Sequence, residues 1–525
     1  MVPSWALTAI IVFAGCILAY FIGATLPNYD QDVRGVNLQV YILIVAVVCT
    51  IGAVTNNYPA LLAVGTWMPF AIPLAGFSQF PVLVLILAWI GLMLFFRLCL
   101  SGTLGYVKSF NLFFLIVFAW VPIRFLMNPV HKFGASVEGG SGVSGAAPYF
   151  YYVFAAAVLL VLGAVLSSRE KIMSYMNWCF WMVFVIGVAF LHCAFIPATA
   201  PFLYSWGVFA AGNMGDGILR IVQLPAYGLF LVQAALCPDL FRLKRPLPWY
   251  LIAATFYLCP FALFFKRPLQ VLLLFQGTIM MIVGGNRSTI VAALLAVPVI
   301  LILRRSTHAL AVMIAVAAIG VVALRFTVGE MGQGEISPLV RCFGIFDSKI
   351  DKASGGDASS QFRYDVWQSG MEKIMESPIV GKGFGNLPKH LDTTSTEVMQ
   401  STDFEVILAG GEAHNGFVTA AYGFGIPFML ALTAGLVLRF FSQVKMALKS
   451  DKHDKELRDL QALLASMYPV YSVGLYTGFD MSVTGLWIYV AMGFILEHLP
   501  RSSSARDSTP TAAQPAAPYL YPSRY

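Results

Sequence analysis

The sequence is short of charged residues. Lys, Arg, Asp and Glu make up 11% of the 525 residues, whereas hydrophobic residues make up 58%. A soluble domain of this size carries about 25% charged residues, so less than half of the charge of an ordinary water-facing surface is present. Long apolar runs account for the deficit, because a membrane span needs about 20 mostly apolar residues. The composition therefore predicts an all-α, polytopic integral membrane protein.

Motifs of metal and nucleotide chemistry are also missing. There are eight cysteines but no CxxC pair, and only Cys342 lies in a long polar segment, which argues against a disulfide framework or a zinc site. No HExxH or Walker A sequence occurs, and the DxD sequence Asp30-Gln-Asp32 lies in a short predicted loop. We therefore expect no metal and no other cofactor.

The net charge of +7 does not indicate nucleic acid, because most Lys and Arg residues flank apolar runs and are better read as topology signals. The first apolar run, Trp5 to Leu26, has no basic segment before it, so we expect a span and not a cleaved signal peptide. If the basic clusters are cytoplasmic, both termini are inside, and the loops outside are 27–37, 128–148, 200–219 and 326–412.

Apolar runs of span length recur along the chain. The predicted spans are 5–26, 38–55, 59–77, 80–98, 110–127, 149–167, 178–199, 221–237, 288–303, 309–325, 413–440, 460–480 and 484–499. Within 249–284, two apolar runs are split by Lys266 and Arg267, although the topology requires an odd number of crossings. We expect one crossing there plus a short re-entrant or interfacial piece, which makes about 12–14 transmembrane helices in all.

Five segments follow from this topology. We expect N-terminal transmembrane helices in 1–200, the transmembrane part of the core in 201–325, and C-terminal transmembrane helices in 413–499. Residues 326–412 form one large loop on the outside. The segment 500–525 is rich in Ser, Ala, Pro and Thr, which predicts a disordered cytoplasmic tail.

The loop 326–412 is patterned and does not read as a linker. It holds half of the 26 acidic residues of the chain. Apolar residues recur at helical spacing from Phe362 to Met375. Ser377-Pro378 then stops the helix, and Gly381-Lys-Gly-Phe-Gly-Asn386 supplies turn chemistry. We expect a small folded cap whose amphipathic helix lies on the membrane surface.

Three polar residues at span ends are candidates for chemistry, because polar groups near hydrocarbon are costly and tend to mark function. Arg220 and Arg287 each lie at the outer end of a predicted span, and His414 lies where the loop 326–412 re-enters the membrane. Each also has a structural explanation. An arginine at a span end commonly snorkels to the headgroups, and an interfacial histidine is commonly a hydrogen-bonded structural residue.

Together with the loop, these residues form an ordered set of motifs. The loop contains Arg363-Tyr-Asp-Val-Trp367 and Ser377-Pro-Ile-Val-Gly-Lys-Gly-Phe-Gly-Asn386. It ends in Glu412-Ala-His-Asn-Gly-Phe417, followed by Tyr422-Gly-Phe-Gly-Ile-Pro427. This order resembles the O-antigen ligase and O-antigen polymerase superfamily of bacterial envelope glycosyltransferases. The resemblance covers about residues 200–440.

The resemblance implies a GT-C-like membrane fold in the bacterial inner membrane, with the large loop and the active face in the periplasm. It implies an enzyme that transfers a glycan from an undecaprenyl-diphosphate carrier to an acceptor hydroxyl, without metal or nucleotide sugar. The implied partners are the lipid-linked glycan donor, a glycan or lipid acceptor and the bilayer. A regulator of chain length would be a further partner of a polymerase, and no nucleic acid is expected.

On this resemblance, Arg220 and Arg287 hold the diphosphate and stabilise its departure, because arginine stays charged and binds phosphate oxygens bidentately. Histidine has an unperturbed pKa of about 6.5, so His414 suits the role of base or orienting group for the acceptor hydroxyl. Glu412 or another loop carboxylate is the alternative base.

Further residues complete the predicted substrate site. Arg363 is either another phosphate contact or the anchor of the loop helix, and the anchor role is favoured. Asn286 and Asn415 neighbour the catalytic candidates in sequence and are expected to bind substrate together with Glu412.

Three functions stay open at this point. The His-Asn-Gly-Phe sequence and a loop without extra domains favour a polymerase of O-antigen or exopolysaccharide repeat units. The alternative is an O-antigen ligase that attaches the finished glycan to a lipid acceptor, as in lipopolysaccharide. A transporter of lipid-linked oligosaccharides is disfavoured, because acidic residues are almost missing from the spans and no half-length repeat is visible.

Overall fold

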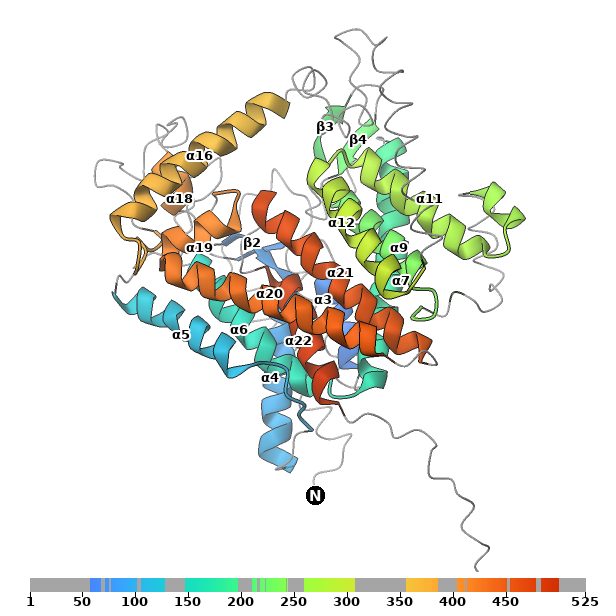
Figure 1. Ribbon diagram of the computed structural model, residues 1–525, viewed down its shortest axis with the longest axis horizontal. Helices are drawn as coiled ribbons and strands as arrows, with labels where there is room; N and C mark the ends of the chain where they lie inside the picture. Colours follow the sequence, from blue (N-terminus) through green and yellow to red (C-terminus); the bar gives the residue numbers. More distant parts are fainter. Residues whose placement is uncertain are drawn as a thin grey trace, which may run out of the picture.

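The computed structural model of the chain is predominantly helical and adds two small β-hairpins (Figure 1). The predicted spans 5–26, 38–55 and 309–325 and the predicted tail 500–525 lie outside the described residues. The described residues are 57–67, 71–74, 77–101, 105–127, 147–196, 210–214, 218–221, 223–241, 243, 259–306, 356–385, 404–409, 411, 413–450, 454–477 and 483–499.

Helices form most of the described chain. They are α3 (Tyr58–Trp67), α4 (Val82–Ser101), α5 (Leu112–Met127), α6 (Ala147–Val165), α7 (Arg169–Phe195), α9 (Leu224–Leu236), the 3₁₀-helix η2 (Pro260–Phe264), α11 (Pro268–Val283), α12 (Arg287–Leu303), α16 (Gly356–Glu376), α18 (Phe404–Ala409), α19 (Gly416–Phe424), α20 (Ile426–Lys449), α21 (Lys455–Thr477) and α22 (Thr484–His498). The strands are β1 (Ala71–Leu74), β2 (Phe77–Pro81), β3 (Ala210–Met214) and β4 (Ile218–Ile221).

Several helices have the composition of membrane spans. By length and hydropathy, three described helical segments can cross a membrane: Pro148–Val165, Arg169–Phe195 and Ile426–Lys449. Shorter apolar segments of 10–17 residues accompany them within α4, α5, α9, α11, α12 and α22. The described part of the chain is thus an apolar helical bundle, as expected. The total of about 12–14 spans stays a prediction.

The run 59–77 is not one membrane-crossing helix. α3 ends at Trp67, and the chain then forms β1, which pairs antiparallel with β2. Pro69 and Pro73 follow the end of α3, and proline interrupts a helix because it lacks an amide hydrogen and clashes with the preceding turn. A helix of ten residues is about 15 Å long, roughly half the thickness of the hydrocarbon core.

The run 413–440 is also divided. α19 ends at Phe424 and α20 begins at Ile426. Gly425 between them has φ +92°, in the left-handed region that glycine adopts without steric penalty. Pro427 lies in the first turn of α20, where a proline is tolerated because the amide there has no partner within the helix.

Helices α12 and α21 run antiparallel and define two ends of the bundle. Leu303 at the end of α12 clusters with Ala462 near the start of α21. Ala292 near the start of α12 packs with Val470 and Val473 in the second half of α21. We call the end where α12 starts and α21 finishes the loop end, because α16 lies on that side (Figure 1). The opposite end is the charged end.

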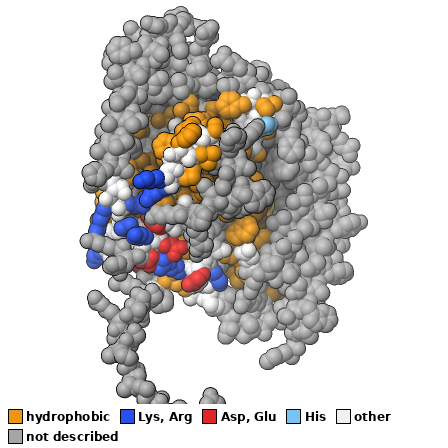
Figure 2. All heavy atoms as spheres, turned by 90° about the vertical axis from the view of Figure 1, so that its right-hand side faces the viewer, with side chains coloured by type: hydrophobic (Ala, Val, Ile, Leu, Met, Phe, Trp, Pro, Cys, Tyr) orange, Lys and Arg blue, Asp and Glu red, His pale blue; other side chains and the backbone are white. Residues whose placement is uncertain are grey.

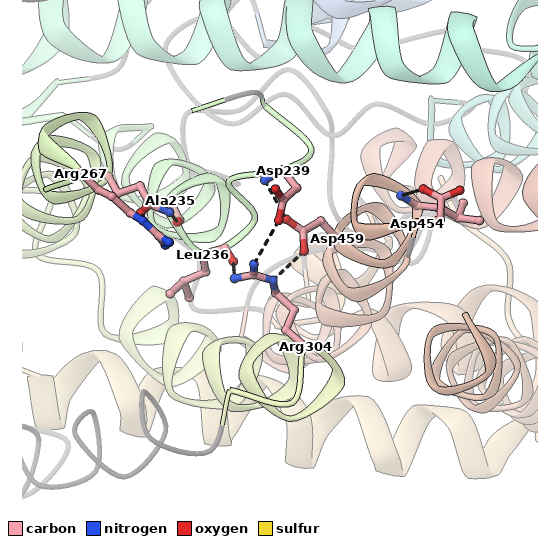
Figure 3. A network of polar contacts seen from close by, with 9 residues as sticks. Ala235, Leu236, Asp239, Arg267, Arg304, Asp454 and Asp459 are labelled. Carbon is pink, nitrogen blue, oxygen red and sulfur yellow. Dashed lines mark hydrogen bonds and ion pairs between the residues drawn. The ribbon is translucent and has the colours of Figure 1, made fainter. Parts of the chain in front are cut away.

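A partly buried arginine joins three segments at the charged end (Figure 3). Arg304, just after α12, donates from Nε to Asp459 Oδ1 of α21 at 2.6 Å. Its Nη2 lies 3.7 Å from Asp239 Oδ2, just after α9, and its Nη1 donates to the carbonyl oxygen of Leu236. The Asp459 side chain is fully buried, so its charge is balanced inside the protein and not by water.

Charged groups are concentrated on the surface as well. Figure 2 shows acidic and basic side chains gathered into one mixed cluster beside a broad apolar surface. Among the described pairs, Arg169 contacts Asp454 at 2.6 Å and Glu456 at 3.2 Å. This segregation is expected of a bundle whose sides face hydrocarbon, where an isolated charge is costly.

At the loop end, turn 381–385, which follows α16, packs directly against turn 423–425, which separates α19 from α20. We call this contact the glycine interlock. Backbone hydrogen bonds fasten its two edges: Lys382 N to Tyr422 O and Ile426 N to Pro378 O, each 2.7 Å. The segment after α16 is therefore fixed to the start of α20.

Only glycine fits at the centre of the glycine interlock. Gly381 has φ +77°, and a Cβ placed on it would lie 2.6 Å from backbone atoms of all three residues of the 423–425 turn. A Cβ on Gly425 would overlap the carbonyl group of Ile379. Phe384 fills the remaining space with no exposed surface.

Replacing Gly381 with alanine should lower the thermal unfolding temperature of the purified protein. The left-handed backbone costs an L-residue about 1–2 kcal/mol, and the contact with the 423–425 turn adds to that cost. Gly91→Ala is the matched control, because a Cβ at Gly91 meets nothing within 4 Å. The measurement is Tm in detergent by size-exclusion fluorescence, and equal Tm values for wild type and Gly381→Ala would contradict the prediction.

Removing one partner of the buried Arg304–Asp459 pair should destabilise the bundle by about 3–5 kcal/mol, because the other charge stays buried without its partner. The double variant Arg304→Met/Asp459→Leu should lose less than the sum of the two single variants. Lys373→Met is the control, since its partner Glu376 is half exposed and such pairs contribute about 0–1 kcal/mol. Strictly additive losses in unfolding free energy would show that the two side chains are not coupled.

Candidate functional site

The residues before α12 set the position of Arg287. Gly284 lies directly against Pro225 in the first turn of α9, and Gly285 has φ +60°. The Asn286 side chain caps α12, since its Oδ1 accepts the backbone N–H two residues later at 3.1 Å. Arg287 is then the first residue of the helix and is half-buried.

Arg220 is part of β4, just before α9, and its side chain lies outside the described part of the structure. Its backbone is at the loop end. The first turn of α9 meets Gly284, whereas the last residue of α9, Leu236, meets Arg304 at the charged end. Arg220 and Arg287 therefore belong to neighbouring segments of the same end.

His414 lies in the short turn that leads into α19. It has φ +50°, an uncommon backbone conformation for a residue other than glycine. Two contacts hold the turn: Trp367 Nε1 of α16 donates to Ala413 O at 3.0 Å, and Asn415 Oδ1 caps α19 by accepting from the N–H groups of Phe417 and Val418. The imidazole itself is partly exposed.

Arg363 of α16 is the charged group that acts on His414. Partial burial, and secondly the nearby Arg363 guanidinium, lower the pKa of His414 below its ordinary value. Both causes disfavour the imidazolium, the first by desolvation and the second by repulsion. His414 is therefore held in its neutral form at neutral pH, the form in which an imidazole accepts a proton.

A chain of contacts brings the His414 turn to the end of α21. Trp367, which bonds the residue before His414, also packs on Tyr476 with ring centroids 5.2 Å apart. Tyr476 is in the last turn of α21, and the start of α12 lies along that half of α21. Arg287 and His414 thus belong to the same end of the bundle.

The Gly-Lys-Gly-Phe-Gly turn resembles a phosphate-binding loop in composition only. Four of its five backbone N–H groups are already bonded within the protein. The bonds run from Gly381 to Ser377 O, from Lys382 to Tyr422 O, from Phe384 to Tyr149 Oη and from Gly385 to Ala409 O, at 2.7–3.0 Å. Lys382 forms an ion pair with Glu376. The turn is therefore a structural support.

The sequence analysis did not single out Arg124, in the last turn of α5. Its side chain is only 6% exposed. Nη2 donates to Gly381 O at 3.0 Å, its Nε has no hydrogen-bond partner, and among the described residues no carboxylate pairs with it. The signal was present in the sequence, because Arg124 is a cation inside the apolar run 110–127.

The predicted site residues have different outcomes. Arg363 and His414 are neighbours, while Asn286 and Asn415 use their side-chain oxygens as helix caps. Glu412 lies outside the described residues. No group of three His, Cys, Asp or Glu side chains suited to a metal occurs in the described ranges, and metal independence stays a prediction.

Comparison with known proteins gives one match. No curated protein matches the chain. A family model described as O-antigen ligase matches residues 271–449, from α11 to the end of α20. The match includes Arg287, Arg363 and His414 and the two turns of the glycine interlock, whereas Arg220 lies outside it. Residues 271–449 are thus similar to the O-antigen ligase family, in a protein that contains apolar, membrane-type helices.

Proposed function

We propose that the protein is a membrane glycosyltransferase that moves a glycan from an undecaprenyl-diphosphate carrier to an acceptor hydroxyl at the loop end. The single observation that carries this proposal is the position of His414 beside Arg363, within the segment that matches the O-antigen ligase family. On this proposal the loop end faces the periplasm and the charged end faces the cytoplasm of a bacterial inner membrane.

The charge distribution supports an anionic donor. Arg124 and Arg363 form no ion pair among the described residues, whereas Arg169 and Arg304 at the charged end are paired with carboxylates. Arg287 adds its charge to the first turn of α12, where the helix dipole already favours anions. A diphosphate beside Arg363 would therefore meet a cation that no carboxylate of the described residues pairs with.

The proposed transfer divides the work between two sets of residues. The acceptor oxygen forms a bond to the anomeric carbon and its proton passes to His414, which is neutral and able to accept it. The bond between that carbon and the diphosphate oxygen breaks, and both electrons leave with the carrier. Arg287, with Arg220, stabilises the charge that grows on the diphosphate.

We propose further that the reaction polymerises O-antigen or exopolysaccharide repeat units. The basis is the His-Asn-Gly-Phe sequence and a loop without an extra domain. The second candidate is a ligase that transfers finished glycan to a lipid acceptor, and the description of the matching family as O-antigen ligase favours it. Both candidates use the same donor carrier.

Arg287→Gln and His414→Ala, made separately in the native host, should each abolish the surface polysaccharide product while the lipid-linked glycan accumulates. Arg287→Gln removes the charge that stabilises the diphosphate, and His414→Ala removes the proton acceptor. Each loss should lower the transfer rate by about a hundredfold or more. Gel profiles of the polysaccharide and of the lipid-linked precursors give the answer.

Arg305→Gln is the matched control for Arg287→Gln, since Arg305 is exposed and follows the far end of the same helix. It should keep a normal profile. Accumulation of single repeat units would support a polymerase, and accumulation of long polymer on the carrier would support a ligase. Normal profiles for both site variants, with the proteins present in the membrane, would rule out the proposed mechanism.

Arg363→Gln should move the acid limb of the pH–rate profile to higher pH. Arg363 lowers the pKa of His414, so its removal lets that pKa rise, and the neutral base is then lost at a higher pH as the solution is acidified. The shift should be small, because solvent screens a partly exposed pair. Transfer with purified lipid-linked donor is measured as kcat/KM against pH.

Lys373→Gln is the control for Arg363→Gln. It removes a positive charge from the same helix, ten residues further on, which is about 15 Å along the axis. Its acid limb should coincide with that of the wild type. If the acid limbs of the Arg363 variant and the wild type coincide as well, His414 is not the group that titrates.

A further inference from the structure

Helix α16 has more apolar surface than its neighbours cover. Its inner face packs into the core through Val366 and Ile374, which are 0% and 1% exposed. A second group of apolar side chains lies next to that face on the helical wheel and is between 52% and 72% exposed. This outer stripe consists of Tyr364, Met371 and Met375, with Ile379 just beyond the helix end.

The rest of the helix surface is polar. Asp365, Glu372 and Glu376 share the arc that follows the outer stripe. α16 therefore has three sides: one buried in the protein, one apolar and open, and one acidic. Contiguous apolar surface left open on a folded protein marks an interaction site. If the partner is apolar or anionic, the acidic side of the helix must point away from it.

The far end of the outer stripe lies level with the ends of two apolar helices. Ile379 stands between Pro378, whose oxygen accepts the first N–H of α20, and Gly381, whose oxygen accepts from Arg124 in the last turn of α5. The glycine interlock thus holds this part of the loop at the depth where α5 ends and α20 begins (Figure 1).

The two neighbouring helices are also apolar and open at that depth. Leu126 and Met127 at the end of α5 are 74% and 57% exposed, and Leu430 in the second turn of α20 is 56% exposed. α20 is one of the described helices that can cross a membrane, so its exposed apolar side chains face lipid. The outer stripe of α16 continues this lipid-facing surface onto the loop.

We propose that the outer stripe seats α16 in the bilayer surface at the loop end, with Met371, Met375 and Ile379 among phospholipid chains just below the headgroups. Met375 and Ile379 enter deepest, because they lie nearest the start of α20. The acidic arc stays in water, away from anionic headgroups that would repel it. The membrane then fixes the helix that carries Arg363, a role separate from the transfer chemistry.

Site-specific photo-cross-linking tests this docking. Benzoylphenylalanine is placed at Met375, and in a second variant at Met371, in the full-length protein. Each variant is reconstituted in nanodiscs of phosphatidylethanolamine and phosphatidylglycerol without any polyprenyl lipid. After irradiation, mass spectrometry of the peptides identifies what each position has captured. The result does not depend on transfer activity, so the docking and the proposed function can fail separately.

Two reference positions calibrate the yield. Leu438, 69% exposed within α20, should give phospholipid adducts, and the exposed Glu372 on the acidic arc should give only background. Adducts at Met375 and Met371 several-fold above Glu372 would support the proposal. Phospholipid yields at both positions equal to Glu372 would overturn it, whether the side chains react with water, with another protein or with a second copy of the chain.

Discussion

The backbone contact between the 381–385 and 423–425 turns constrains the whole loop end. Because a Cβ on Gly381 would overlap the opposite backbone, the two turns meet at a distance that only glycine permits. Other groups then depend on this contact: Arg124 donates to Gly381 O, and Trp120 of α5 donates to Phe424 O at 3.0 Å. Three helices, α5, α16 and α20, are joined at one point, and the His414 turn is supported from the same loop.

The two ends of the bundle differ in whether their arginines are paired with carboxylates. At the charged end, Arg304 is balanced by Asp459 and Asp239 inside the protein, which stabilises the ends of α9, α12 and α21 against one another. At the loop end, the described arginines Arg124 and Arg363 have no carboxylate partner among the described residues. An unpaired cation near hydrocarbon is unfavourable unless something anionic balances it, which is consistent with the anionic, lipid-linked donor that we propose.

Much of the site was visible in the sequence, because its parts are local motifs. The apolar run 288–303 predicted α12, and the spacing from Phe362 to Met375 predicted α16. The role of Arg363 could not be read locally. Its effect on His414 acts between residues some fifty positions apart and exists only because Trp367 fastens the His414 turn to α16. The support role of the glycine turn, and the burial of Arg124 beside it, depend on the same long-range packing.

By itself, the sequence determined that the chain is a membrane-type helical protein, since hydrophobic composition and run length are additive properties of residues. It also determined where glycines and prolines can interrupt helices. The apolar composition of 59–77 and of 413–440 predicted one span each, but in the structure the glycine and proline breaks divide both runs. Tertiary structure alone decided which polar groups form hydrogen bonds within the protein and which can still bind a ligand. Asn286 and Asn415 became caps, the glycine turn lost its N–H groups to carbonyls, and His414 acquired a lowered pKa. Hydrogen bonding, burial and electrostatic repulsion depend on neighbours in space, which the order of residues does not state.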